Sequence, residues 1–306
     1  MHRREFGLMA GSALVMLQST QAGWSAPASM SVDSHAHTFL HSLPMVPNRR
    51  YTPDYDAPLA GYLAMLDRDG STHGVLIQPS FLGFDNSFLV SALQKHPEKL
   101  RGVAVVQPQI TRHALADLAR QGIVGIRLNL IGEEDPDFSQ TVWRTHLKDI
   151  AELGWQVEVQ AEAERLSKII PPVVAAGATM VVDHFGRPDK KTGIDDPGFR
   201  YLLSMARTGK VFVKLSAPYR LGPGERGHQI AAQAAPLLLN AFGPDHLVWG
   251  SDWPHTEFEK TAPGPKEARA ELDKWVPDVR QRQQILGETP ARLFKFEKQI
   301  EKRRAI

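Results

Sequence analysis

The amino-acid sequence predicts an α/β protein built as a single (β/α)8 TIM-like barrel. Eight short apolar runs recur along the chain, and stretches with helical spacing lie between them. Polar residues suited to catalysis stand at the ends of many of these runs. Strands that alternate with helices favour a parallel sheet, and eight is the number of strands that closes such a barrel.

The predicted strands, in chain order, are SVDSHAH (31–37), GVLIQPS (74–80), RGVAVVQ (101–107), IVGIRLN (123–129), WQVEVQ (155–160), TMVVDHF (179–185), KVFVKLS (210–216) and HLVWGSD (246–252). Segments such as 113–122 and 163–177 have helical spacing and end in glycine, as helices commonly do. An open doubly wound sheet is the alternative, but no glycine-rich nucleotide loop follows the first strand. The stretch 41–58 is rich in Pro, Asn, Arg and Tyr, and predicts a long loop over the top of the barrel.

The first 28 residues predict an export signal rather than part of the fold. Arg3 and Arg4 are followed by Phe6 and a modest apolar stretch, which ends in Ala26-Pro27-Ala28. This pattern resembles a Tat-type signal with a small-x-small cleavage site, and an ordinary Sec signal or an uncleaved anchor is the alternative. We therefore expect one barrel domain over residues 29–306 in a periplasmic protein.

The charge balance and the absence of cysteine exclude several classes of protein. The formal net charge is +2, which argues against a nucleic acid partner. The chain has no cysteine, so it forms no disulfide and has no thiol chemistry. No segment after the signal is long and apolar enough to suggest a membrane span.

Three histidines and one aspartate form the candidate catalytic group. Side chains alternate along a strand, so His35 and His37 point to the same side. His184 and Asp252 end two other predicted strands, and all such ends meet at the mouth of a barrel. Imidazoles placed there can bind a metal ion or donate hydrogen bonds.

Several motifs together resemble the amidohydrolase superfamily. SHAH, VVDHFGRPD, VKLSAPYR, WGSDWPH and GETPARLFKF lie between residues 31 and 296, so the resemblance covers nearly all of the chain after the signal. They are similar to the amidohydrolase-2 branch and, within it, to the 2-pyrone-4,6-dicarboxylate lactonases. The resemblance implies a hydrolase that opens a lactone ring.

In this resemblance Asp252 is the general base that takes a proton from water. Burial between Trp249 and Trp253 would raise its pKa and suit that task. His35, His37 and His184 either polarise the lactone carbonyl without a metal, or hold one divalent ion such as zinc together with Asp252. The sequence leaves this choice open.

Cations and hydroxyl groups near the strand ends predict an anionic substrate. Arg127 stands near the end of a predicted strand, Arg187 and Arg220 follow two others, and guanidinium groups bind carboxylates through paired hydrogen bonds. Tyr51 and Ser80 match positions that contact the substrate in the lactonases.

The sequence departs from the lactonase pattern at two substrate contacts. Glu133 and Glu134 stand where that pattern has a basic residue, and Gln160 replaces an aromatic hydroxyl. We therefore expect a small anionic lactone, carboxylated or sulfonated, rather than the pyrone dicarboxylate in particular.

Two other functions remain open from the sequence. One is a metal-dependent decarboxylase or C–C hydrolase of the same branch, and the other is a non-catalytic barrel that binds anions. Glu158 is expected to point into the barrel. It either pairs with a cation such as Lys214, the structural role that we favour, or serves as a second acid.

Overall fold

The computed structural model describes residues 30–296, so the predicted signal segment lies outside the described residues. It contains a sheet of eight parallel strands in which each strand pairs with the next along the chain. The strands are β1 (Val32–Ala36), β2 (His73–Ile77), β3 (Leu100–Ala104), β4 (Ile123–Asn129), β5 (Gln156–Gln160), β6 (Thr179–Val182), β7 (Val211–Ser216) and β8 (Leu247–Gly250). Each overlaps one of the eight predicted runs.

The barrel closes through the segment that follows β8. Ala36 at the end of β1 forms a parallel bridge with Trp253. The backbone N–H of His37 donates to the Trp253 carbonyl at 2.7 Å, and the N–H of Asp252 donates to the His35 carbonyl at 2.9 Å. The prediction of a (β/α)8 barrel is therefore confirmed, and its seam is made by residues of the candidate site.

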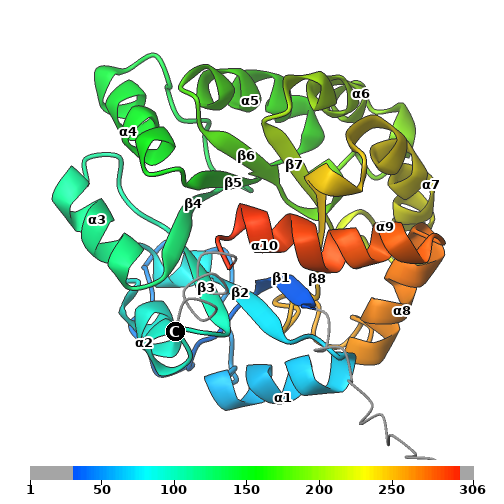
Figure 1. The fold of residues 1–306 in the computed structure, drawn as a ribbon, viewed down its shortest axis with the longest axis horizontal. Coiled ribbons are helices and arrows are strands. Elements are labelled where there is room, and N and C mark those ends of the chain that lie inside the picture. The colour runs from blue at the N-terminus through cyan, green and yellow to red at the C-terminus, as the bar shows by residue number, and fades with distance from the viewer. Residues whose placement is uncertain (1–29, 297–306) are drawn as a thin grey trace, which may run out of the picture.

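Eight helices surround the barrel, one after each strand (Figure 1). They are α1 (Leu59–Asp69), α2 (Ser87–Lys95), α3 (Arg112–Arg120), α4 (Thr141–Glu152), α5 (Leu166–Ala175), α6 (Pro197–Ser204), α7 (Glu225–Phe242) and α8 (Pro265–Trp275). Two short helices follow, α9 (Val279–Gln283) and α10 (Thr289–Leu293), joined by a π-helical turn at Gln284–Glu288. In Figure 1 α10 crosses the centre of the ring.

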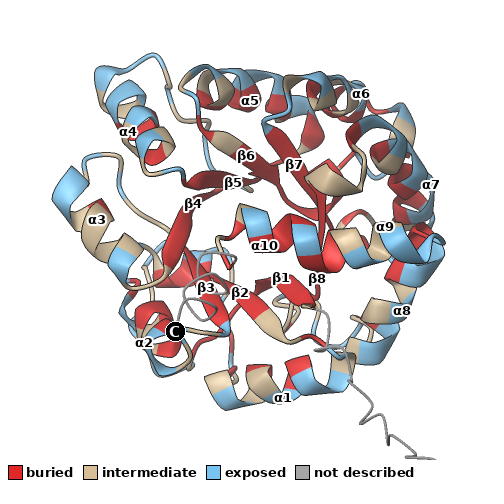
Figure 2. Cartoon of the chain, viewed as in Figure 1, coloured by how far each residue is buried: buried red, intermediate tan, exposed pale blue. Residues whose placement is uncertain are grey.

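Alternation along the strands separates an outer apolar layer from a polar interior. On β7, Val211, Val213 and Leu215 belong to the large core between the sheet and the helices. Figure 2 shows that the strands are mostly buried. Lys214, which alternates with them, is buried on the opposite side of the strand. Each fully buried aliphatic side chain of the outer layer contributes about 1.5–3 kcal/mol through burial, so the outer layer holds the fold and leaves the interior for chemistry.

The amino-terminal end of the barrel is filled by apolar side chains. Phe294 and Phe296, which follow α10, pack with Val75, Val103 and Val248 from three strands. In the described part of the chain this layer fills the end of the barrel opposite to the candidate site.

The predicted long loop at 41–58 lies over the carboxyl ends of the strands. An antiparallel bridge joins Phe39 to Ala57 at its base. Near its middle, Arg50 donates from Nη1 to the Ile131 carbonyl at 2.7 Å, and the Tyr51 hydroxyl donates to Glu259. The loop therefore bridges the segments that follow β4 and β8.

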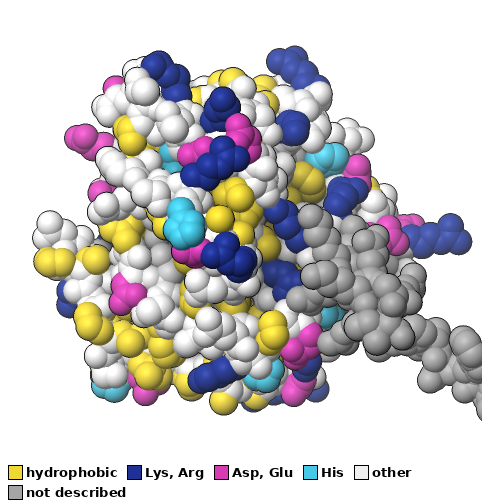
Figure 3. Space-filling model, turned by 60° about the vertical axis from the view of Figure 1, so that its left-hand side comes forward, with side chains coloured by type: hydrophobic (Ala, Val, Ile, Leu, Met, Phe, Trp, Pro, Cys, Tyr) yellow, Lys and Arg dark blue, Asp and Glu magenta, His cyan; other side chains and the backbone are white. Residues whose placement is uncertain are grey.

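The surface carries charges of both signs. On the face shown in Figure 3, basic and acidic side chains are interspersed, in keeping with the near-neutral net charge. Among residues 30–296, no helix combines the length and the apolar character that crossing a bilayer requires.

Candidate active site

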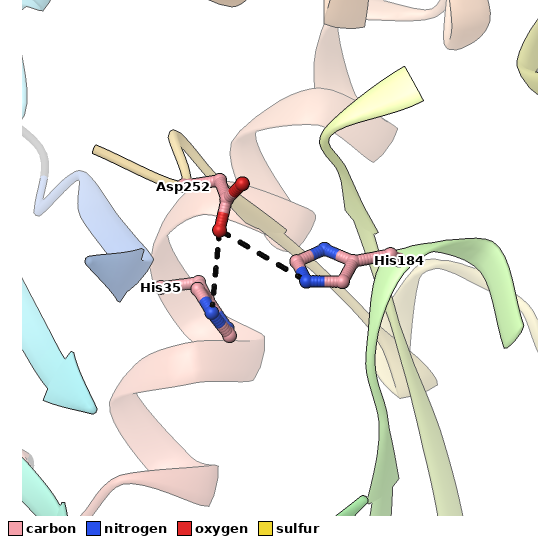
Figure 4. A group of neighbouring side chains, drawn as sticks. All are labelled: His35, His184 and Asp252. Atoms are coloured by element: carbon pink, nitrogen blue, oxygen red, sulfur yellow. Dashed lines mark ion pairs between the residues drawn. The ribbon is translucent and has the colours of Figure 1, made fainter. Parts of the chain in front are cut away.

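The three predicted histidines and Asp252 meet at the carboxyl end of the barrel. The ring centroids of His35 and His37 lie 5.0 Å apart, and that of His184 lies 4.9 Å from His35. Figure 4 shows His35 and His184 converging on the Asp252 carboxylate from β1 and from the turn after β6. The sequence pattern thus predicted correctly which side chains come together.

The strand β1 is irregular next to His35. The pairing with β2 shifts register between Asp33 and Ala36. Asp33 accepts hydrogen bonds from the Ser251 N–H and hydroxyl, both at 2.7 Å, and so ties β1 to the segment after β8. Close approach also requires glycine at position 250, because a Cβ there would lie 2.5 Å from the His35 Cβ.

The two oxygens of Asp252 have different surroundings. Oδ2 accepts hydrogen bonds from the Tyr219 hydroxyl at 2.7 Å and from the Arg220 Nε at 2.6 Å. Oδ1 is buried without a hydrogen-bond partner among the described residues, and lies 3.5 Å from His35 Nε2 and 3.9 Å from His184 Nε2. One oxygen therefore anchors the carboxylate, and the other is free to accept a proton.

The backbone at the site is strained. His184 and Asp252 have φ of 48° and 60°, in the left-handed region that non-glycine residues seldom adopt. Such a conformation costs about 1–3 kcal/mol per residue and is common at functional sites. Here it aims both side chains at the same point.

The expectation that the pKa of Asp252 is raised was wrong. Burial acts to raise the pKa, but the Arg220 guanidinium, the largest opposing cause, holds it well below its usual value. The indole of Trp249 does not form a dry pocket around Asp252, because it belongs to the outer core, where Arg269 lies over its ring. Asp252 is thus a carboxylate held ionised by a nearby guanidinium.

All three histidines are neutral near pH 7. Burial lowers the pKa of His35 well below its usual value, with Lys214 as the next cause, and it lowers the pKa of His37 to about 4 and of His184 to about 3. A neutral imidazole has one N–H and one lone pair, so the partner of each Nδ1 decides what Nε2 can do.

The partners of Nδ1 give His35 and His37 opposite tautomers. His37 Nδ1 lies 2.8 Å from the Ile77 carbonyl, which can only accept, so its Nε2 has the lone pair. His35 Nδ1 lies 2.9 Å from the Lys214 ammonium, which can only donate, so its Nε2 has the proton. His184 Nδ1 contacts the Ser216 hydroxyl at 2.8 Å, which allows either tautomer.

A buried layer of charges lies directly beneath the histidines. Glu158 Oε2 accepts from Lys214 Nζ at 2.5 Å, which confirms the predicted pairing of these two residues. Asp183, which the sequence analysis missed, lies 3.0 Å from Arg127 Nη2 and 3.4 Å from Lys214 Nζ. Its position directly after the apolar run of β6 was the signal that could have identified it.

Two neighbouring cavities open at this end of the barrel. A cavity of about 30 Å³ is lined by His37, His184 and Asp252 together with four of the predicted substrate contacts, namely Tyr51, Ser80, Arg127 and Arg220. A larger cavity of about 820 Å³ is lined by Arg187, the fifth of them, and shares Arg220. Glu133 and Glu134 line neither cavity, whereas Gln160 lines the small one.

The arginines at these cavities differ in how far they are already paired. Arg127 is bound by Asp183 and donates to the side-chain oxygen Oε1 of Gln160 at 2.8 Å, and Arg220 is bound by Asp252. Arg187 has no ion pair within residues 30–296, and its buried Nε has no hydrogen-bond partner there. Burial, followed by Arg220, lowers the pKa of Arg187 to about 10, so it remains a cation that an anionic ligand could neutralise.

The residues of the site could hold a metal ion. Ligand atoms of His35, His184 and Asp252 lie within 4.8 Å of one another, and the same holds for His35, Glu158 and Asp183. The buried Nε2 atoms of His35 and His184 and the Oδ1 atom of Asp252 all lack partners in the described part of the chain. However, the proton on His35 Nε2 leaves that atom no lone pair for a metal, so His35 does not fit as a ligand in this arrangement.

Comparison with known proteins places the chain beside lactone hydrolases. The model of the amidohydrolase family matches residues 32–296. The chain is 33% identical to a 2-pyrone-4,6-dicarboxylate hydrolase of Comamonas testosteroni, over 86% of this chain and 90% of that protein. It is 30% identical to a 4-sulfomuconolactone hydrolase of Rhizobium radiobacter, over 88% and 93%.

A solved structure is also similar over most of its length. It is that of a probable 2-pyrone-4,6-dicarboxylic acid hydrolase from Acinetobacter baumannii with citric acid bound. The TM-score is 0.84 and the identity 37%, and the match covers 87% of this chain and 99% of that one.

Proposed function

The chain belongs to the amidohydrolase family, and from that premise we propose that it hydrolyses a small anionic lactone with Asp252 as the base. The observation that carries the proposal is the convergence of three buried polar atoms, Asp252 Oδ1, His35 Nε2 and His184 Nε2, which have no hydrogen-bond partner among residues 30–296. They offer an acceptor for a proton of water beside an N–H donor for a developing oxyanion.

The reaction adds one water molecule across the ester bond of the ring. Asp252 Oδ1 takes a proton from the water as its oxygen attacks the lactone carbonyl carbon. The lone pair on His37 Nε2, 4.0 Å from Oδ1, can accept the second hydrogen of the water and orient it. When the tetrahedral intermediate collapses, the bond to the ring oxygen breaks and that oxygen takes the proton from Asp252.

His35 stabilises the charge that develops on the carbonyl oxygen. Its Nε2–H is held in a buried site, where a prealigned donor stabilises an oxyanion far more than it would in water. Since the low pKa makes Asp252 a weak base, stabilisation of the oxyanion has to supply a large share of the rate enhancement. No step requires a metal ion.

The substrate is a lactone that carries a carboxylate or a sulfonate. Arg187 lines the larger cavity as a cation with no ion pair among residues 30–296, and Tyr51, Ser80, Arg127 and Arg220 line the small cavity next to it. The relatives act on a pyrone dicarboxylate and on a sulfomuconolactone, as their names state, and both are anionic lactones.

The proposal is tested by screening lactones for proton release. Each turnover at neutral pH frees one proton, so a pH indicator in weak buffer reports hydrolysis of muconolactones, pyrone carboxylates and sugar-acid lactones. Turnover of at least one anionic lactone, with its uncharged ester analogue much slower, is expected. Hydrolysis of none of them would leave a barrel that binds anions, which direct binding of the same compounds would then reveal.

A metal-dependent decarboxylase or C–C hydrolase is the second candidate, because the buried clusters could hold an ion. Purified protein would then contain about one tightly held divalent ion per chain and would lose its activity to a chelator. Elemental analysis of the purified protein separates the two functions.

We also propose that the protein is exported to the periplasm, on the pattern of residues 1–28. A reporter fused behind this segment should reach the periplasm, and changing both Arg3 and Arg4 to Lys should prevent export. Export that survives this change would indicate a Sec signal.

A further inference from the structure

We propose that Lys214 is a built-in cation that stands in the place of a metal ion and fixes His35 as a hydrogen-bond donor to the substrate. The inference rests on the lactone hydrolysis proposed above, and it assigns to Lys214 the positioning of His35 rather than contact with the substrate. It also explains how a metal-capable set of side chains works without a metal.

Lys214 lies at the centre of the second cluster that could hold an ion. Its side chain is 0% exposed and comes from the inner side of β7. Nζ lies 2.9 Å from His35 Nδ1, 2.5 Å from Glu158 Oε2 and 3.4 Å from Asp183 Oδ1. His35, Glu158 and Asp183 form one of the two groups of described residues whose ligand atoms lie within 4.8 Å of one another. The ammonium group therefore contacts the same nitrogen and oxygen atoms that a divalent ion would use as ligands.

The strands bring these groups to one level of the barrel. Arg127 on β4 pairs in register with Glu158 on β5, and Asp183 directly follows β6. Lys214 comes from β7, the next strand around, and His35 comes from β1, which β8 separates from β7 in the closed barrel. Lys214 Nζ therefore forms both an ion pair with Glu158, 56 positions away in the sequence, and a hydrogen bond with His35, 179 positions away.

The charges of the buried layer and the base above it balance without an added ion. Three acidic side chains face three cations through ion pairs, namely Glu158, Asp183 and Asp252 against Arg127, Lys214 and Arg220. Burial and Asp183 raise the pKa of Glu158 to about 7, while Lys214 and Arg127 act in the opposite direction and favour its carboxylate form. A divalent ion would bring two more positive charges into a site that is already neutral, and burying unbalanced charge is unfavourable. Removal of Lys214 would instead leave one negative charge in excess and three potential metal ligands free.

The ammonium also decides the tautomer of His35. It has three N–H groups and no lone pair, so His35 Nδ1 must accept from it. The carboxylate oxygens of Glu158 and Asp183 lie 3.5 and 3.4 Å from Nδ1, beyond the usual hydrogen-bond length, and do not compete well for a proton there. The proton therefore sits on Nε2, 3.5 Å from Asp252 Oδ1, where it serves an oxyanion.

The experiment compares the wild type with Lys214→Met, a variant of similar volume without the charge. Three measurements are made: the His35 tautomer from ¹⁵N NMR of histidine-labelled protein, zinc uptake from elemental analysis after dialysis against zinc, and kcat and KM for the best lactone. His35→Gln assigns the His35 signals. Arg101→Met is the matched control, because it removes a buried cation inside the barrel, packed on Phe296 at the opposite end.

In Lys214→Met, His35 should no longer be purely the Nε2–H tautomer. The variant should take up about one zinc per chain, because His35, Glu158 and Asp183 are then free to act as metal ligands. Its kcat should fall about 100-fold, the loss typical of one oxyanion donor, while KM changes little. Arg101→Met should keep the tautomer, the metal content and kcat of the wild type.

Restoring the charge supplies a further test. The chain has no cysteine, so Lys214→Cys carries a single thiol, and alkylation of that thiol in unfolded protein with bromoethylamine rebuilds an ammonium side chain. The refolded, alkylated protein should regain most of kcat and lose its zinc uptake.

The inference is overturned if folded Lys214→Met keeps the Nε2–H tautomer and binds no zinc, or if its kcat equals that of the wild type. Should Lys214→Met not fold, Glu158→Gln with Lys214→Met keeps the layer neutral, and the same tautomer and kcat measurements decide. Failure of the proposed function is distinct, because it shows as absence of lactone turnover in the wild type, while tautomer and zinc uptake still report on Lys214.

Discussion

Replacement of Asp252 by asparagine separates the chemistry of the base from its structural role. The amide has nearly the shape of the carboxylate, and its oxygen can keep the bonds that Oδ2 accepts from Tyr219 at 2.7 Å and Arg220 at 2.6 Å. The NH2 group then replaces Oδ1, so it meets the His35 Nε2–H as one donor facing another and cannot take a proton from water.

The expected loss in kcat is about 10²–10⁴-fold, the usual contribution of a positioned base, which corresponds to about 3–5 kcal/mol of barrier. Stability should fall less, by about 1–3 kcal/mol, because Arg220 keeps a hydrogen-bond acceptor but loses an ionic partner. Proton release at neutral pH gives kcat, and thermal unfolding followed by circular dichroism gives the change in stability.

Asp69→Asn is the matched control. Asp69 is a partly buried carboxylate at the end of α1 and lines neither cavity of the site. It should leave kcat unchanged. If Asp252→Asn folds and retains more than about one-tenth of the wild-type kcat, the general-base role is refuted, since a factor of ten is smaller than any base of this kind supplies.

Further predictions concern the substrate, the pH and the metal. Arg187→Gln should raise KM for anionic lactones about tenfold without lowering the melting temperature, because the guanidinium has no ion pair within residues 30–296 to lose; an equal rise for an uncharged lactone would contradict it. Because the pKa values of His37 and His184 are lowered by burial to about 4 and about 3, the unfolded chain binds protons first, so stability should drop as the pH falls from about 6.5 towards about 4, as melting curves across that range would show. Between about pH 8 and about pH 6, kcat should not fall as the pH is lowered, because Asp252 is already ionised. A decrease of kcat towards lower pH in this range would show that the pKa of Asp252 is raised instead. Dialysis against a chelator should leave kcat within about twofold, and zinc added back should not raise it.

The fold was predictable because barrel strands leave a regular trace in the sequence. Each predicted run overlaps an observed strand, and the rule that strand ends share one rim placed His35, His37, His184 and Asp252 together. Neighbours in sequence were a poorer guide to electrostatics. Trp249 lies three positions from Asp252 but shares the outer side of β8 with Leu247, so alternation alone could have excluded it from the pocket.

Contacts between distant segments could not be predicted in the same way. The pKa of Asp252 depends on Arg220, 32 positions away, and the tautomer of His35 depends on Lys214, 179 positions away. A strand-end pattern predicts that such groups lie at one rim, but it does not predict which nitrogen meets which oxygen. Those pairings depend on the register between strands, including the shift within β1, which the sequence does not reveal.

The balance of charge also bears on how the catalytic cycle ends. The ion pairs of the site leave Arg187 as a cation that has no partner among residues 30–296, so the site is prepared for about one negative charge on the substrate. Hydrolysis turns a neutral ester into a carboxylate, and the product therefore has one more negative charge than the substrate. That new carboxylate forms next to Oδ1 of Asp252, which is ionised again once its proton has passed to the leaving oxygen. Two carboxylates in one buried site repel each other, so the same low pKa that weakens Asp252 as a base favours release of the product.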